Sequence, residues 1–216
     1  MASEKSDEEQ MWDTFIGKLA FDVQRSLDRY NDENIESNKR DVVRTIVAAI
    51  EGITWAYREH VQEIGITLEA SNSLYDLAFS EKTYSISEKG DLKMRPNFIP
   101  TVSMIRLITN RAKELCPQLD IDFSGSGWSD LRKAISIRNR ITHPKASSDL
   151  KISESEIQTA RSGFFWFISF VPDVMGQTNQ SLQKYAKTLT NFIEDLKSGD
   201  TEALRLYRYI ESIDEN

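Results

Sequence analysis

The sequence contains few cysteines, prolines and glycines, the residues that cross-link a fold or interrupt its helices and strands. Its 216 residues include one cysteine, Cys116, five prolines and nine glycines. A single thiol cannot form an internal disulfide, and no second cysteine or paired histidine lies near it in the sequence to bind a metal ion. We therefore expect a structural thiol in the reducing cytoplasm. The low proline and glycine content argues against a loop-rich or disordered chain.

Long hydrophobic runs are also missing. The longest apolar stretch covers residues 163–171 (GFFWFISFV), which is about half of the roughly 20 residues that a membrane helix needs. We expect this stretch to form a buried helix. Residues 1–9 are acidic and polar, which does not fit a secretory signal. These features predict a cytoplasmic protein that makes no contact with a membrane.

Positive charge is scarce over the chain as a whole. The formal net charge is −7, which argues against tight, nonspecific coating of nucleic acid. Residues 129–145 are the exception, because they hold five basic residues against one acidic residue and include one of only two histidines. A local basic site is therefore compatible with an acidic protein.

Helical periodicity is what the sequence has in abundance. Apolar residues recur at three- and four-residue steps along most of the chain, which is typical of amphipathic helices. Pro172 is expected to end the helix that begins at Ser153, because proline interrupts a helix. The predicted helices cover residues 12–30, 37–64, 67–79, 100–115, 129–142, 153–172, 177–197 and a short stretch after 200.

Two segments depart from this period. Apolar and polar residues alternate on either side of Lys89-Gly90-Asp91 within residues 82–96, which predicts a small hairpin or irregular insertion. Residues 123–127 predict a flexible loop, and Ser129 is the expected cap of the helix that follows.

Short connections between long amphipathic helices predict an all-α, up-and-down helical bundle. We expect a single domain over residues 1–216, with its core at roughly 10–175 and additional helices in an extension over 176–216.

Most familiar catalytic patterns are missing. Gly125-Ser126-Gly127 lacks the Gly-Lys of a phosphate-binding loop. Two histidines that are distant in sequence offer no zinc-binding spacing, and no Ser-His-acid arrangement is recognisable. We therefore expect neither a metal ion nor a cofactor.

The segment from Arg138 to His143 (RNRITH) carries the remaining chemistry. Pro144 disfavours helical geometry at His143, so a helix ending at Thr142 would free His143 to swing back towards Arg138. A guanidinium can grip a phosphate through two hydrogen bonds, and an imidazole exchanges protons near neutral pH. Together these groups suit attack of a ribose 2′-hydroxyl on its own phosphate. The alternative is that the terminal histidine only caps its helix.

Residues 137–144 (IRNRITHP) resemble the signature of the HEPN superfamily, in which an arginine is followed by four to six residues and a histidine, often with an asparagine directly after the arginine. The resemblance implies a bundle of four or five helices that forms a homodimer with a composite active site. It also implies a metal-independent endoribonuclease, common among toxins and antiviral defence effectors. By position, Arg138 would stabilise the phosphate, His143 would act as acid or base, and Asn139 would orient the substrate or His143.

Three further residues are candidates for binding substrate. Glu51 is either the acidic residue that some family members supply from the long preceding helix or one half of a surface ion pair. Arg140 would bind the RNA backbone or face solvent. Lys145 stands where some toxin members carry a tyrosine that an antitoxin modifies, so a separate antitoxin or regulator would have to act differently here.

Three functions therefore compete. The first is a HEPN-type endoribonuclease that leaves 2′,3′-cyclic phosphate ends on RNA, which the intact motif favours. The second is a non-catalytic HEPN-like module that binds a nucleotide or a protein in a larger assembly, which the acidic composition favours. The third is an unrelated helical interaction protein, which predicts no dimer.

Overall fold

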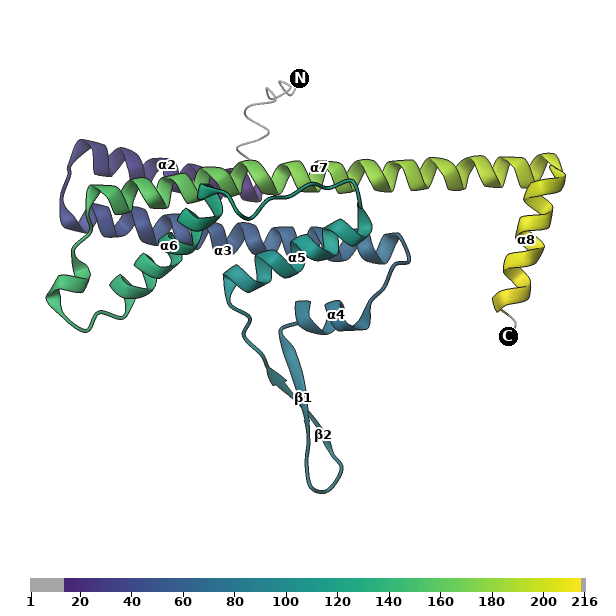
Figure 1. Ribbon diagram of the computed structural model, residues 1–216, viewed down its shortest axis with the longest axis horizontal. Helices are drawn as coiled ribbons and strands as arrows, with labels where there is room; N and C mark the ends of the chain where they lie inside the picture. The colour runs from purple at the N-terminus through teal and green to yellow at the C-terminus, as the bar shows by residue number, and fades with distance from the viewer. Residues whose placement is uncertain (1–13, 215–216) are drawn as a thin grey trace, which may run out of the picture.

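The computed structural model describes residues 14–214, which fold into α-helices and one two-stranded hairpin (Figure 1). The expected all-α class is confirmed. The expected start of the first helix, at Trp12, lies outside the described residues. The elements are α2 (Phe15–Asp32), α3 (Glu36–Thr67), α4 (Ser73–Phe79), β1 (Lys82–Ile86), β2 (Leu92–Pro96), α5 (Thr101–Leu115), α6 (Ser126–Thr142), a 3-10 turn (Ser147–Leu150), α7 (Glu154–Ser198) and α8 (Thr201–Asp214).

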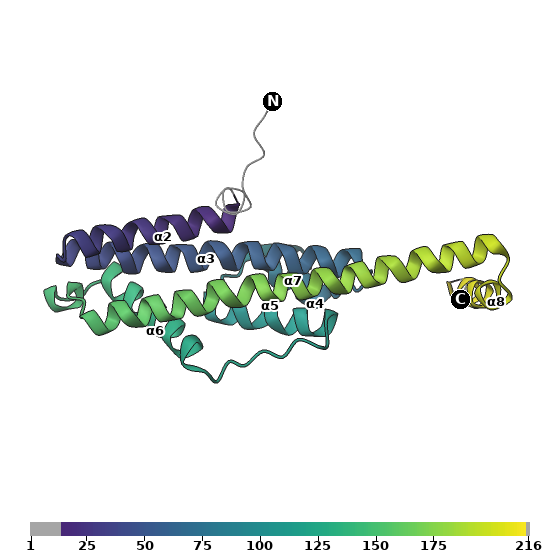
Figure 2. The same cartoon turned by 90° about the horizontal axis from the view of Figure 1, so that it is seen from above.

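Helix α3 is the central element of the bundle. It packs against α2, α5, α6 and α7, and α2, α3 and α7 run side by side in both views (Figures 1 and 2). Neighbouring helices surround α3, and its residues Ile46, Ile50, Ile53 and Tyr57 are fully buried. Because α3 is central, its polar residues can contact the other helices, as Glu51 contacts α6 and His60 contacts α7.

The hairpin projects from the bundle (Figure 1). Strands β1 and β2 are antiparallel, with Ile86 opposite Leu92 near the turn and Lys82 opposite Pro96 at the base. Gly90 adopts a left-handed conformation in the turn (φ 82°), which glycine reaches at no steric cost. The prediction of a small hairpin near 82–96 is confirmed.

Helix α7 is continuous from Glu154 to Ser198, so the predicted break at Pro172 is wrong. Phe167 and Val171 are buried before the proline, and Val174 after it. Packing of this continuous face against α3 and α6 outweighs the hydrogen bond that proline removes. Pro172 itself is exposed.

The last turns of α7 extend beyond the bundle and end at α8 (Figures 1 and 2). Between Thr178 and Ala203 no residue is buried. Ala203, in α8, is 7% exposed. None of the helices in residues 14–214 combines the length and the apolar character needed to cross a membrane.

Candidate functional site at the end of helix α6

The Arg138–His143 segment forms the last turn of α6. Thr142 is the final helical residue, and His143 follows in a non-helical conformation (φ −122°, ψ 61°). The His143 N–H still donates to the carbonyl of Asn139 at 3.0 Å. The expected helix end is therefore confirmed, in line with the restriction that Pro144 places on the residue before it. Thr142 and His143 are both exposed.

Helix α6 is positioned by an unusually close crossing with α7. A Cβ atom on Gly127 would lie 2.3 Å from Cγ of Trp166, and one on Gly163 would lie 2.5 Å from the backbone nitrogen of Leu131. Only glycine fits at these two positions without a shift of its neighbours. The crossing therefore places α6, and with it the motif, relative to α7.

The predicted flexible loop through Gly127 is wrong at its end. Helix α6 begins at Ser126, with Gly125 at its cap position, and Ser129 lies inside the helix. The reason is tertiary, because Gly127 is buried against α7, so packing favours an earlier helix start than the local sequence suggests.

Arg138 forms an ion pair with Glu51 of α3, through its Nη2 and the Oε1 of the carboxylate. The arginine side chain is 25% exposed and that of Glu51 43%. The Nε of Arg138 is buried and has no hydrogen-bond partner among the described residues. The ion pair therefore joins Glu51 of α3 to Arg138 of α6.

Arg138 and Asn139 line an open cavity of about 560 Å³. It lies between α3, α6, the start of α5 and the base of the hairpin, elements that can be traced in Figure 1. Its remaining lining residues are Glu51, Thr54, Trp55, Arg58, Glu81, Phe98, Ile99, Pro100, Thr101, Met104 and Ile135.

The candidate catalytic residues divide between this cavity and the surface. Arg138 and Asn139 lie in the cavity wall, and His143 is not among the lining residues. The structure therefore brings together Arg138, Asn139 and Glu51, and leaves His143 exposed at the helix end. Their roles in catalysis stay predictions.

The other histidine belongs to a different contact. His60 of α3 lies with its Nε2 2.8 Å from Oγ1 of Thr178 in α7. Burial lowers the pKa of His60 below its ordinary value. This histidine joins two helices of the bundle and is not part of the cavity wall.

Arg140 points to the start of α7. Its Nη2 lies 2.6 Å from Oε1 of Glu156, and its Nη1 donates to the carbonyl of Lys151 at 3.1 Å. The backbone N–H of Lys145 donates to Asp149 at 2.8 Å, and this bond is the main cause of a lowered pKa at Asp149. Arg140 is therefore engaged within the fold and does not simply face solvent, and its contact with an RNA backbone stays a prediction.

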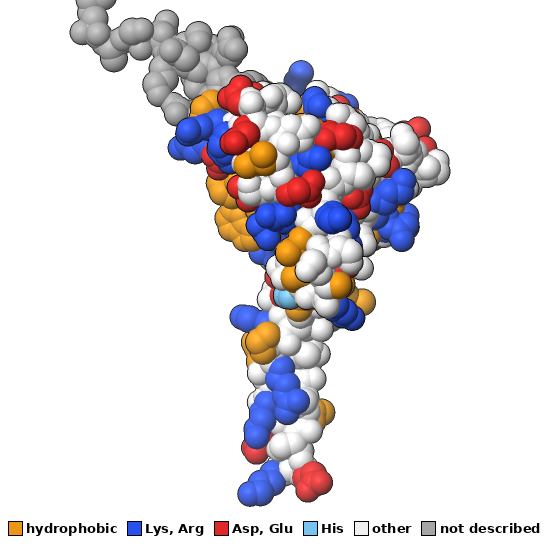
Figure 3. Space-filling view, turned by 90° about the vertical axis from the view of Figure 1, so that its left-hand side faces the viewer, with side chains coloured by type: hydrophobic (Ala, Val, Ile, Leu, Met, Phe, Trp, Pro, Cys, Tyr) orange, Lys and Arg blue, Asp and Glu red, His pale blue; other side chains and the backbone are white. Residues whose placement is uncertain are grey.

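Carboxylates offset much of the positive charge in residues 129–145. Lys133 pairs with Asp130 at 3.3 Å, and Arg138 and Arg140 pair with glutamates of other helices. Acidic and basic side chains are interspersed over the end of the bundle, where neither sign forms a continuous area (Figure 3). On the side shown in Figure 3, the local excess of basic residues in the sequence therefore does not form a continuous basic area.

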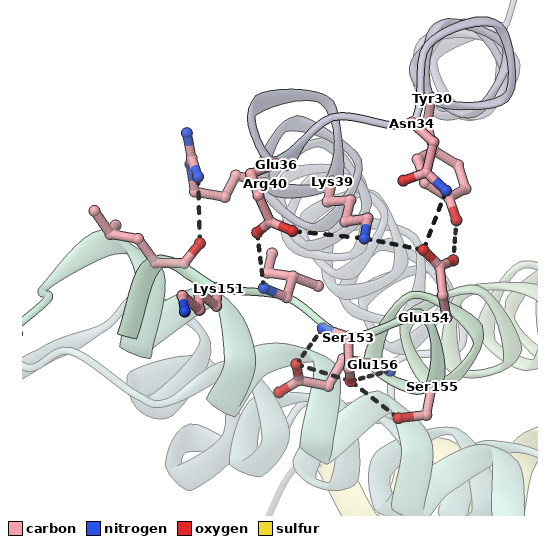
Figure 4. Close-up of polar contacts among 12 residues, drawn as sticks. Tyr30, Asn34, Glu36, Lys39, Arg40, Lys151, Ser153, Glu154, Ser155 and Glu156 are labelled. Carbon is pink, nitrogen blue, oxygen red and sulfur yellow. Dashed lines mark hydrogen bonds and ion pairs between the residues drawn. The ribbon is translucent and has the colours of Figure 1, made fainter. Parts of the chain in front are cut away.

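The chain that follows the motif is fastened to α3 at two points (Figure 4). The backbone N–H of Ile152 donates to Glu36 at 3.2 Å, and Arg40 donates to the carbonyl of Leu150 at 3.2 Å. These bonds hold the connection between α6 and α7 against the first turns of α3.

Helix α7 begins as predicted, after Ser153. The Ser153 hydroxyl accepts from the N–H of Glu156 at 3.3 Å, and the Glu156 carboxylate accepts from the N–H of Ser153 at 2.9 Å (Figure 4). Such a reciprocal pair satisfies two donors at the helix start. The same Glu156 binds Arg140, so the cap of α7 also anchors the last turn of α6.

Trp55, Arg58, Glu81 and Phe98 line the cavity but are not among the predicted site residues. Arg58 follows Glu51 by seven residues, and this helical spacing predicts that both lie on the same face of α3, although it does not predict the cavity. Phe98 lies between Pro96 and Pro100 in a segment without a period, and no sequence signal links it to α6.

A scan against models of protein families, a search of curated proteins and a search of solved structures each find no match for this chain. The site is therefore interpreted from its own contacts. Among the described residues, no group of three His, Cys, Asp or Glu side chains is arranged to hold a metal ion.

Proposed function

We propose that this chain is a metal-independent endoribonuclease of HEPN type. The observation that supports the proposal is the last turn of α6, which presents Arg138 and Asn139 to an open cavity and leaves His143 exposed directly after the helix. A cation that stabilises a phosphate and a group that moves protons are what cleavage by the substrate's own hydroxyl requires.

In the proposed reaction the ribose 2′-oxygen attacks the adjacent phosphorus. The bond from phosphorus to O2′ forms while the bond to O5′ breaks, which leaves a 2′,3′-cyclic phosphate and a 5′-hydroxyl. A base takes the proton of the 2′-hydroxyl, and an acid protonates the departing O5′. His143 serves as one of these groups, Arg138 stabilises the charge on the phosphate, and Asn139 orients the substrate.

The proposal includes a homodimer with a composite site. One copy supplies one His143, whereas the reaction uses both an acid and a base. The exposed position of Thr142 and His143 supports an arrangement in which a second copy covers this end of α6. A role as a toxin or defence effector, restrained by a separate antitoxin or regulator, belongs to the same proposal.

The test is cleavage of a mixed RNA pool in EDTA by the wild type and by His143→Ala and Arg138→Ala. Each variant is expected to lose at least about 100-fold in rate, the lower range for general acid–base catalysis. Arg132→Ala is the matched control, because Arg132 is an exposed arginine of the same helix and does not line the cavity. Products with 2′,3′-cyclic phosphate ends are expected, and equal cleavage by all variants would contradict the proposal.

The second candidate is a non-catalytic HEPN-like module that binds a nucleotide or a protein. The observation that favours it is the pairing of Arg138 with Glu51 and of Arg140 with Glu156, which reduces the positive charge available to an RNA strand. Equal inactivity of folded wild type and variants, together with retained binding of a nucleotide or protein, is the outcome that this function predicts.

A further inference from the structure

The cavity beside Arg138 has aromatic walls as well as charged ones. Trp55 of α3 is 52% exposed and Phe98 is 81% exposed, and both line the cavity. Large aromatic side chains are favoured where a partner covers them, because their flat faces stack on other rings. Met104 and Ile135 add further apolar surface to the wall.

Phe98 is held in place by the segment around it. The carboxylate of Glu81 accepts from the N–H of Ile99 at 3.4 Å and from Arg58 at 3.3 Å, and the carbonyl of Glu81 accepts from the N–H of Asn97 at 2.7 Å. Residues on both sides of Phe98 are therefore tied to Glu81, and through Arg58 to α3. The backbone on both sides of Phe98 is therefore fixed at the cavity rim.

Arg138 has hydrogen-bonding capacity left over in this cavity. A guanidinium carries five N–H donors, and Glu51 takes one of them, on Nη2. The Nε–H is buried and unpartnered within residues 14–214. A buried donor without an acceptor is rare in folded proteins, because burial without a hydrogen bond is unfavourable. The Arg138 side chain is 25% exposed and lines the cavity, so an oxyanion there can accept from its remaining Nη donors without displacing Glu51.

The start of α5 adds a favourable field for an anion. Pro100 and Thr101 line the cavity, no side chain of the described residues caps this helix, and its first turn contains no acidic residue. The N–H groups of a first helical turn carry partial positive charge. This helix end supports the anion site that the cavity and Arg138 define.

We propose that this cavity binds one nucleoside monophosphate unit. The base stacks on Phe98 and Trp55, the phosphate binds Arg138 and the start of α5, and Asn139 hydrogen-bonds the edge of the base. The volume of about 560 Å³ falls within the range of about 300–1,000 Å³ that is usual for ligand pockets. The inference rests on the proposed function for its choice of a phosphate-bearing ligand, and it identifies the cavity as the subsite that holds an unstacked nucleotide.

The test is binding of a fluorescein-labelled, single-stranded hexanucleotide with 2′-deoxy sugars, measured by fluorescence anisotropy with the full chain. Such a strand lacks the attacking hydroxyl and stays intact. Phe98→Ala and Trp55→Ala are each expected to weaken binding about tenfold, the effect of losing one stacked base. Phe165→Ala is the matched control, because Phe165 is 48% exposed on α7 and does not line the cavity.

Competition separates a free nucleotide from a nucleotide within a strand. Uridine or adenosine monophosphate that displaces the hexamer from the wild type, with the corresponding nucleosides and inorganic phosphate at least tenfold weaker, supports binding of base and phosphate as one unit. A hexamer displaced only by other strands, yet still sensitive to Phe98→Ala, supports the subsite for a nucleotide within a strand. Thermal denaturation of each variant checks that it is folded.

Two results overturn the inference. One is the absence of binding to the hexamer and to both mononucleotides, and the other is equal affinity in Phe98→Ala, Trp55→Ala and Phe165→Ala. If the wild type cleaves RNA but Phe98→Ala and Trp55→Ala bind the hexamer as tightly as the wild type does, the proposed function holds and the subsite does not. Binding that depends on Phe98 and Trp55, without any RNA cleavage, would leave the subsite standing without the nuclease.

Discussion

At the scale of single residues, Glu154 connects three parts of the chain. Its carboxylate accepts a hydrogen bond from the hydroxyl of Tyr30 in α2, lies 2.9 Å from the ammonium of Lys39 in α3, and accepts from Asn34 between them at 3.2 Å (Figure 4). The carboxylate also stands in the first turn of α7, where the helix dipole favours negative charge. The connection is strongest while Glu154 is ionised.

Stability at low pH should therefore depend on Glu154. The hydrogen bond from Tyr30, followed by that from Lys39, lowers the pKa of Glu154 from 4.5 to about 2. Because the folded-state pKa lies below the ordinary value, the stabilisation is present above about pH 4.5 and is lost as the pH falls towards 2. Urea denaturation at a series of pH values should show the wild type losing more stability than Glu154→Gln over this interval.

The contribution of Glu154 is the difference between the two proteins, since other carboxylates titrate over the same interval in both. Glu154→Gln should also be less stable than the wild type at neutral pH, because glutamine carries no charge for Lys39. Parallel curves of stability against pH for the two proteins would show that the ionisation of Glu154 adds nothing to folding.

The sequence identified Glu51 and Arg138 separately, but it could not pair them. The period of α3 places Glu51 beside the apolar stripe, and the motif places Arg138 near the end of α6. Their contact depends on how the two helices pack, which no local pattern encodes. Phe98 was missed for the same reason, because tertiary contacts, including those of Glu81 with Ile99 and with Arg58 of α3, bring its segment to the cavity.

At the scale of elements, the crossing of α6 and α7 depends on Gly163. An added Cβ would lie 2.5 Å from the Leu131 nitrogen and 2.6 Å from its Cα, and these backbone atoms cannot rotate away. Gly163→Ala should lower the free energy of unfolding by about 1–3 kcal/mol, as overpacking usually does. Urea denaturation followed by tryptophan fluorescence measures the change.

Gly176→Ala is the matched control on the same helix. Nothing lies within 4 Å of the Cβ that it adds, so alanine should raise the stability by about 0.5–1 kcal/mol through its better helix propensity. If Gly163→Ala stabilised the protein as much as Gly176→Ala, the close crossing would not constrain α6. Loss of RNA cleavage in Gly163→Ala alone would link the crossing to the proposed site.

Periodicity predicted which segments are helical, and packing decided where several of them begin and end. Residues 82–96 lost the helical period and form the hairpin. Pro172 is a local signal for a break, but the buried face of α7 continues through it. Gly125-Ser126-Gly127 is a local signal for a loop, but the contact between Gly127 and Trp166 extends α6 back to Ser126. In both cases a tertiary contact outweighed local propensity.

At the scale of the whole molecule, the bundle and its extension differ in how they are stabilised. The buried residues of α7 run from Ile157 to Thr178 and pack against α3 and α6. Beyond Thr178 the helix keeps an apolar pattern, and Tyr185 and Leu189 are 41% and 46% exposed. Apolar periodicity identified this helix from the sequence, but periodicity does not reveal whether the apolar face has a partner.

A chain that ends at Lys184 should consequently fold as stably as the full chain. Among residues 185–209 only Ala203 of α8 is buried, so deletion of residues 185–216 should change the free energy of unfolding by less than about 1 kcal/mol. All four tryptophans precede residue 185, so their fluorescence reports on the same part of both proteins during urea denaturation. A loss of several kcal/mol that grows with the concentration of the full chain would instead mean that the apolar face of the extension packs on a second copy. The extension would then contribute to an interface distinct from the exposed end of α6.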